Sequence, residues 1–173
     1  ALEQRRGRAT LGSELIAASF GPGDGVMWGS GLRGHYAFKN PLEISLSLSG
    51  LTGYSGPVQS FFQWFELGLR PAYSWELSPK TRISAGPAVA AAWLRFSETS
   101  SVDGLAGRSE TWSARAGLFV QWERQVTNTV SFNIGPEIGM LLRPIQAAHE
   151  ATGQRQLGEI WLGLGLGAEV SGL

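Results

Sequence analysis

One long stretch of alternating residues limits what this chain can fold into. From position 130 to 142 every second residue is apolar, and the residues between them are mostly small or polar. Because side chains alternate between the two faces of a strand, this pattern predicts a β-strand with one apolar and one polar face. The strand has roughly thirteen residues. An ordinary strand has about five or six, whereas one that crosses a bilayer needs about nine to eleven.

The same pattern recurs along the whole chain and predicts eight strands. Their expected ranges are about 9–20, 26–39, 42–52, 58–77, 81–96, 110–124, 130–142 and 157–171. Longer loops follow the odd-numbered strands, and tight turns follow the second, fourth and sixth. An even number of strands with long loops at one end and short turns at the other is typical of outer-membrane barrels.

Composition sets the remaining bounds. The 173 residues suffice for one domain, which we expect over 9–173 after a periplasmic lead-in at 1–8. The formal net charge is zero, so no charge excess favours a nucleic-acid partner. There is no cysteine, which rules out disulfides and thiolate metal sites. The longest run without a charged or strongly polar residue is about ten residues, 85–94, too short for a membrane helix.

Alternation alone does not say which face points inward, and a soluble lipocalin-like barrel would put the apolar face inside. Side-chain volume favours the opposite, because an eight-stranded barrel is just wide enough inside for side chains. The apolar set is bulky and the polar set is rich in Gly, Ala and Ser. We therefore expect the apolar face to contact lipid.

Aromatic residues support this orientation over that of a β-sandwich core, because they gather at both ends of the strands. Two interfacial belts are expected around an aliphatic middle. The predicted belt residues are Trp28, Tyr36, Tyr73, Trp75, Trp93, Trp112 and Trp122. The aromatic run 61–65 (FFQWF) is the candidate for a patch that protrudes beyond the bilayer, because its strand is longer than a bilayer requires, but the pattern favours ordinary belt residues there.

With this pattern the chain resembles the small eight-stranded outer-membrane proteins, the class of the OmpA transmembrane domain and OmpX. The resemblance covers about 9–171 and rests on pattern. It implies an all-β fold, an eight-stranded antiparallel up-and-down transmembrane β-barrel with short periplasmic turns and longer extracellular loops. It also implies the bacterial outer membrane as location, with outer-membrane lipid and lipopolysaccharide as partners. The class usually ends on an aromatic residue, whereas this chain ends at Leu173, which leaves open whether the natural chain continues.

Three prolines depart from an ideal strand. Pro71, Pro87 and Pro136 fall within strands on the predicted lipid face. Proline has no backbone N–H to donate to a neighbouring strand, so we expect local bulges or gaps in the sheet at these positions.

Charges of both signs fall on the inward face and predict an ionic network that fills the lumen. Folding neighbouring strands about their turns places Glu14 opposite roughly Arg33, and Glu137 within a residue or two of Arg115. Buried charges need partners, so such a network would plug the barrel. The predicted network is Glu14, Arg33, Glu66, Arg70, Arg115, Glu137 and Glu159. The alternative is a narrow pore lined by these charges.

Enzymatic signals are weak. A lipid-A-modifying barrel would need a nucleophilic serine near a histidine and an orienting acid. His35 and His149 are the only histidines, and neither precedes a serine at the spacing of the lipid A deacylases. His35 is expected to form hydrogen bonds in the lumen and His149 to lie solvated in a loop. The sequence predicts no catalytic residues, cofactor or metal. Membrane anchoring, surface recognition and docking of another envelope protein stay open, with a lipid-A enzyme as the alternative.

Overall fold

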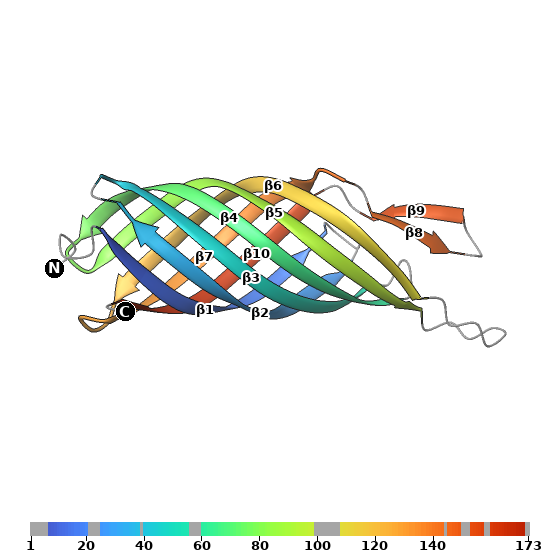
Figure 1. Cartoon of the computed structure of the whole chain (residues 1–173), viewed down its shortest axis with the longest axis horizontal. Helices are drawn as coiled ribbons and strands as arrows, with labels where there is room; N and C mark the ends of the chain where they lie inside the picture. The colour runs from blue at the N-terminus through green and yellow to red at the C-terminus, as the bar shows by residue number, and fades with distance from the viewer. Residues whose placement is uncertain are drawn as a thin grey trace.

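The computed structural model describes residues 7–20, 25–38, 40–55, 60–98, 108–143, 145–149, 153–157 and 160–171. Eight strands close into an antiparallel barrel in the order β1-β10-β7-β6-β5-β4-β3-β2 (Figure 1). These strands are β1 (Arg8–Ser19), β2 (Val26–Ala37), β3 (Leu42–Ser55), β4 (Ser60–Ser78), β5 (Thr81–Glu98), β6 (Arg108–Gln125), β7 (Val130–Leu141) and β10 (Ile160–Ser171). The predicted fold class is confirmed.

The two ends of the barrel differ as expected. The tight turns lie at one end, together with the start of β1 and the end of β10, and the strand ends that the longer connections join lie at the other (Figure 1). In the β6–β7 turn, the Thr127 hydroxyl accepts a hydrogen bond of 3.0 Å from the backbone N–H of Val130. The segment 144–156, predicted to be a polar loop, holds β8 (Ile145–His149) and all but the last residue of β9 (Gly153–Leu157), and these two strands pair with each other. We call the two ends the turn end and the loop end.

The strands are tilted and staggered. Pairing partners followed around the barrel from Ala9 on β1 lead back to Ser19 on the same strand, ten residues (19 − 9) nearer the loop end. Such a stagger is what lets eight strands close with tilted axes. A row of paired residues therefore climbs toward the loop end as it passes from β2 to β6.

The outer surface of the barrel is apolar. Leu15, Leu32 and Leu118 are 66%, 58% and 63% exposed. A continuous apolar surface of this extent is found where a protein contacts lipid or another protein. Within the described ranges, no helix is long and apolar enough to span a membrane.

The ladder between strands breaks at all three prolines. Leu69 pairs with Val89 and Tyr73 with Ala85, so Pro71 lies directly opposite Pro87, and no pair forms between these two. A second gap separates the pairs Phe119–Glu137 and Trp122–Ile134, where Pro136 lies. The predicted gaps are confirmed. The bulge in the described sheet lies instead between Glu76 and Ser78.

Candidate functional site

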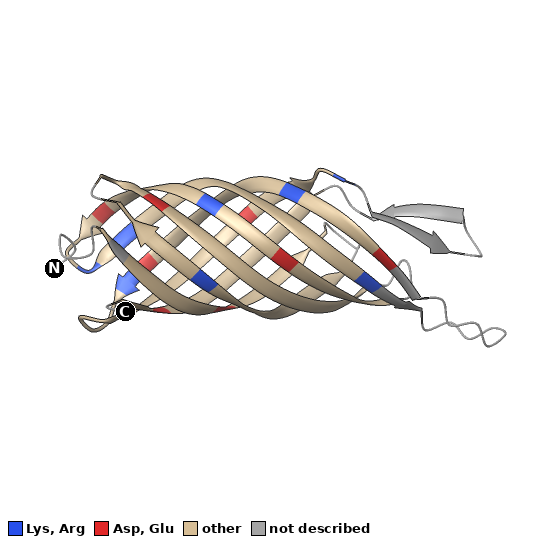
Figure 2. Cartoon of the chain, viewed as in Figure 1, with Lys and Arg blue, Asp and Glu red and all other residues tan. Residues whose placement is uncertain are grey.

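The polar site of this molecule is the lumen, where charged residues from opposite walls meet. Figure 2 shows acidic and basic positions spaced along the barrel wall. They form a central network and a second cluster near the turn end, and an aromatic layer lies near the loop end.

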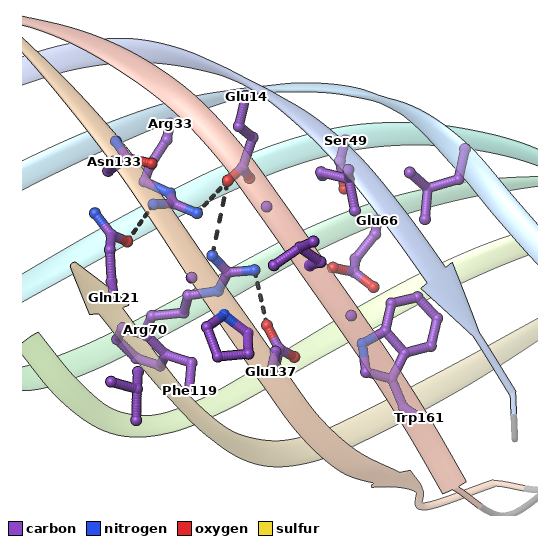
Figure 3. Close-up of a pocket in the computed structure, with 18 of the residues that line it drawn as sticks. Glu14, Arg33, Ser49, Glu66, Arg70, Phe119, Gln121, Asn133, Glu137 and Trp161 are labelled. Carbon is purple, nitrogen blue, oxygen red and sulfur yellow. Dashed lines mark hydrogen bonds and ion pairs between the residues drawn. The ribbon is translucent and has the colours of Figure 1, made fainter. Parts of the chain in front are cut away.

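The first half of the central network joins residues of five strands (Figure 3). Arg33 on β2 pairs with the Glu14 carboxylate on β1, and donates a hydrogen bond of 2.5 Å to the Gln121 side chain on β6. Arg70 on β4 reaches across the lumen. Its guanidinium lies 2.8 Å from the carboxylate of Glu137 on β7 and 3.9 Å from that of Glu14. Arg70 therefore connects opposite walls.

The second half of the network is centred on Arg115 of β6. Its Nε and Nη2 donate hydrogen bonds of 2.7 and 2.6 Å to the two oxygens of Glu66 on β4. It also pairs with Glu137. The indole N–H of Trp64 donates to Glu66 at 3.0 Å, and the Trp161 ring centroid lies 4.4 Å from the Arg115 guanidinium carbon. Bidentate arginine–carboxylate pairs are among the stronger side-chain hydrogen bonds.

The network is balanced in charge, with three arginines and three glutamates. Glu14, Glu66 and Arg115 are 4%, 4% and 3% exposed. The cavity among these side chains has a volume of only about 30 Å³, little more than the space that one or two water molecules need. Side chains therefore fill the middle of the lumen.

The structure brings together six of the seven residues predicted for the network. The seventh, Glu159, lies outside the described residues. Glycines of β10 lie beside the network. A Cβ atom at Gly165 would meet the Glu14 carboxylate at an ordinary contact distance of 3.4 Å, whereas one at Gly163 would lie a tight 3.1 Å from the indole nitrogen of Trp161.

The predicted pairing register needs correction. Glu14 faces Gly31, two residues from Arg33. Glu137 faces Phe119, four residues (119 − 115) from Arg115, and not one or two. The β6–β7 hairpin folds about residue 128, the midpoint of 119 and 137, which places Glu137 farther along β6 from Arg115 than predicted. The ion pair with Arg115 forms because the long arginine side chain bridges the offset.

A second buried cluster lies toward the turn end. Arg82 on β5 donates to Glu123 on β6 at 2.7 Å, and its guanidinium lies 3.2 Å from Glu43 on β3. His35 lies between Ser45, at 3.4 Å, and Glu43, at 3.5 Å. The prediction that His35 forms hydrogen bonds in the lumen is confirmed, whereas the side chain of His149 lies outside the described residues.

The aromatic layer near the loop end is the main feature that sequence reasoning missed. Phe20, Phe62, Trp64 and Trp161 point inward and are each at most 2% exposed. Their ring centroids lie 5.3 to 5.9 Å apart where they touch. Leu94, Met27 and Leu51 pack against them.

The candidate protruding patch at 61–65 is therefore wrong in part. Phe62 and Trp64 are buried in the lumen, while Phe61 and Phe65 point outward, 54% and 47% exposed. The volume argument erred here because a few large rings fit inside when glycines such as Gly53 and Gly163 lie beside them. The alternation along the strand would have placed both residues inside, since positions 62 and 64 lie on the same face as Glu66.

The residues predicted for the aromatic belts all lie on the outer surface. Six are exposed: Trp28, Tyr36, Tyr73, Trp75, Trp112 and Trp122. Trp93 is half-buried because its ring stacks on Phe65, with the ring centroids 5.6 Å apart.

Within the described part of the chain, no three His, Cys, Asp or Glu side chains are grouped so as to hold a metal ion. His35 does lie between a serine and an acid, Ser45 and Glu43. All three side chains are buried, at 4%, 8% and 5% exposed.

Known proteins of the same shape were found by structure alone. No protein-family model matches the sequence, and no curated protein sequence matches it. Among solved structures, Neisserial surface protein A superimposes with a TM-score of 0.68 and 13% identity over 94% of each chain. A major outer membrane protein from Thermus thermophilus gives 0.68 and 16%, over 95% of this chain and 99% of that one. Ail, the attachment invasion locus protein of Yersinia pestis, gives 0.55 and 13%, over 95% and 97%.

The chain has the fold of a small outer-membrane barrel. The resemblance inferred from the residue pattern is thereby confirmed. The matched proteins are bacterial surface or outer-membrane proteins, in agreement with the predicted location. Identities of this size show the fold alone.

Proposed function

We propose that this chain is an outer-membrane barrel with a closed lumen, which anchors in the bilayer and presents its loop end at the cell surface. The observation that carries the proposal is the filled interior. The aromatic layer and the central network lie one above the other, and the cavity between their side chains is about 30 Å³. A barrel of this kind acts through its surfaces and not through its interior.

The two layers oppose ion flow for different reasons. The rings of Phe20 and Phe62 offer an ion no hydrogen-bonding group in place of its water, the indoles of Trp64 and Trp161 offer only one N–H each, and the Trp64 N–H already donates to Glu66. Removing the water around a charge is costly. The central network offers charges, but these are already paired with one another. This supports an anchoring protein over the narrow pore that the sequence left open.

A surface role is supported by the kind of proteins that share the fold. Ail is described as an attachment invasion locus protein, and one structure of Ail is a complex with the heparin analogue sucrose octasulfate. We extend to this chain only the general idea of recognition at the loop end. Docking of another envelope protein would be a second use of the same outer surfaces.

Conductance across a planar lipid bilayer tests the proposal. The purified barrel, inserted and shown to be folded, is expected to give no stable channel openings at physiological salt. Regular openings in the wild-type protein would overturn the closed lumen and favour the narrow pore. Lipid A from cells that overexpress the chain is expected to keep its mass, and an altered mass would favour the enzyme instead.

A further inference from the structure

A row of polar residues crosses the apolar outer surface near the loop end. Thr52 on β3, Gln63 on β4 and Arg95 on β5 are paired neighbours and point outward. The row just below it toward the turn end consists of Gly50, Phe65 and Trp93. The row above it contains the exposed rings of Tyr54 and Phe61. The polar row therefore lies within a band of aromatic residues, where contact with lipid headgroups is expected.

Beside this row lies a hollow bordered by aromatic rings. It has a volume of about 460 Å³, and it is lined by Val26, Trp28, Thr52, Gly53, Tyr54 and Phe61. The rings of Tyr54 and Phe61 lie 5.0 Å apart. The hollow exists because the short Thr52 lies between two larger neighbours, Trp28 and Gln63.

Polar groups around the hollow have unused hydrogen-bonding capacity. Among the described residues, the Tyr54 hydroxyl and the Gln63 amide have no hydrogen-bond partner, and both residues are exposed. The Arg95 guanidinium lies 3.9 Å from Glu110, which is longer than a hydrogen bond. Because rows climb toward the loop end from β2 to β6, Gln63 and Arg95 lie farther from the hydrocarbon than Trp28 does.

We propose that Tyr54, Phe61, Gln63 and Arg95 form a binding site for the phosphorylated sugar headgroup of an outer-leaflet glycolipid, a proposal that rests on the outer-membrane function above. The two rings offer apolar faces to the C–H groups of a sugar, the phenol and amide bind its hydroxyls, and the guanidinium binds a phosphate. Arginine matches phosphate geometry with two parallel donors. An ordinary phospholipid would use the guanidinium but leave the rings, phenol and amide without a matching group.

The turn end offers a comparison within the same molecule. Tyr36 and Phe38 form an aromatic pair with the same 5.0 Å centroid distance. Arg124, the exposed arginine at that end, lies on β6 and pairs with Thr81 and Phe132, away from the pair on β2. At the turn end the single ring of Phe132 therefore lies next to Arg124, whereas at the loop end two touching rings, Tyr54 on β3 and Phe61 on β4, lie beside the strand of Arg95.

Binding of bisphosphorylated lipid A to the folded barrel in detergent micelles tests the proposal, with phosphatidylglycerol as the second probe. Arg95→Gln is expected to weaken lipid A binding about ten-fold, since a charge-assisted hydrogen bond is worth at least about that factor. Tyr54→Leu is expected to weaken it as well. Arg124→Gln, the same change at the turn end, should leave the affinity unchanged. Heat-modified electrophoretic mobility verifies that each variant is folded.

Four results would overturn the site. One is wild-type affinity in the Arg95→Gln variant, and another is equal loss in Arg124→Gln. The third is phosphatidylglycerol binding as tight as lipid A binding, which would mean that any lipid phosphate suffices. If the wild-type barrel bound neither probe, the site would be refuted, while the conductance experiment would still decide the closed lumen separately.

Discussion

Arg115 holds Glu66 by two hydrogen bonds, of 2.6 and 2.7 Å, across the closed interior of the barrel. The two residues are 49 positions apart in the sequence and lie on β6 and β4, which are not neighbouring strands. Their contact depends on barrel closure. Each is at most 4% exposed, so the loss of either partner would leave a buried charge with less compensation.

Removing the arginine should therefore cost much of the stability of the barrel. Arg115→Ala leaves Glu66 with only the Trp64 indole as donor and removes one of the two arginines that pair with Glu137. Breaking a buried pair in this way typically costs about 3–5 kcal/mol. Urea unfolding in detergent micelles measures the free energy of unfolding. Arg124→Ala, at an exposed position, serves as the control and should change it by no more than about 0.5 kcal/mol.

The aromatic layer should be the part that keeps ions from entering at the loop end. Replacing both Trp64 and Trp161 by alanine removes two of its four large rings and exposes the network beneath. We expect the double variant to show channel openings in a planar bilayer where the wild-type protein shows none. Trp28→Ala combined with Trp112→Ala removes two outward-facing indoles, and this control variant should show no channel openings. If the Trp64/Trp161 double variant is folded and still shows no channel openings, the central network alone blocks the lumen.

The facing prolines on β4 and β5 predict a site where stability can be gained. Pro71 and Pro87 lie opposite each other, so neither offers an N–H to the other strand. Pro87→Val restores one donor, and a backbone hydrogen bond contributes about 1 kcal/mol. We expect the free energy of unfolding to rise by about that amount. Slower hydrogen exchange of amides at 86–89 would locate the gain, and unchanged exchange there would show that the gap is held open by something other than the missing donor.

The alternation of residues along each strand was enough to predict most of the fold. The wall of a barrel is a single sheet, so each side chain points either into the lumen or outward. Alternation placed Leu15 and Leu118 outside and Glu14 and Arg115 inside without any knowledge of pairing. The count of eight strands and the asymmetry of loops and turns then fixed a closed barrel. The hairpin at β8 and β9 was missed because its segment is polar and lacks alternation.

Pairing across the lumen was beyond what the sequence could specify. Turn geometry sets the register, and an error of one residue in the fold point of β6 and β7 moves every partner by two. The stagger around the barrel decides that Arg70 meets Glu137 on the opposite wall. Trp161 lies on the same strand face as Gly163, so alternation alone would have placed it inside the lumen. The expectation that large rings point outward led to the opposite prediction.

The most direct measurement of the closed lumen uses the absence of native cysteine. Ser49 is 5% exposed and lines the small cavity beside Glu66, whereas Thr127 lies exposed in the β6–β7 turn. Ser49→Cys and Thr127→Cys would each be treated with a water-soluble, membrane-impermeant thiol reagent in lipid vesicles. We predict rapid labelling at 127, and labelling at 49 only after unfolding. Equal rates at both positions in the folded protein would mean that water-soluble molecules enter the barrel, and would contradict a closed lumen.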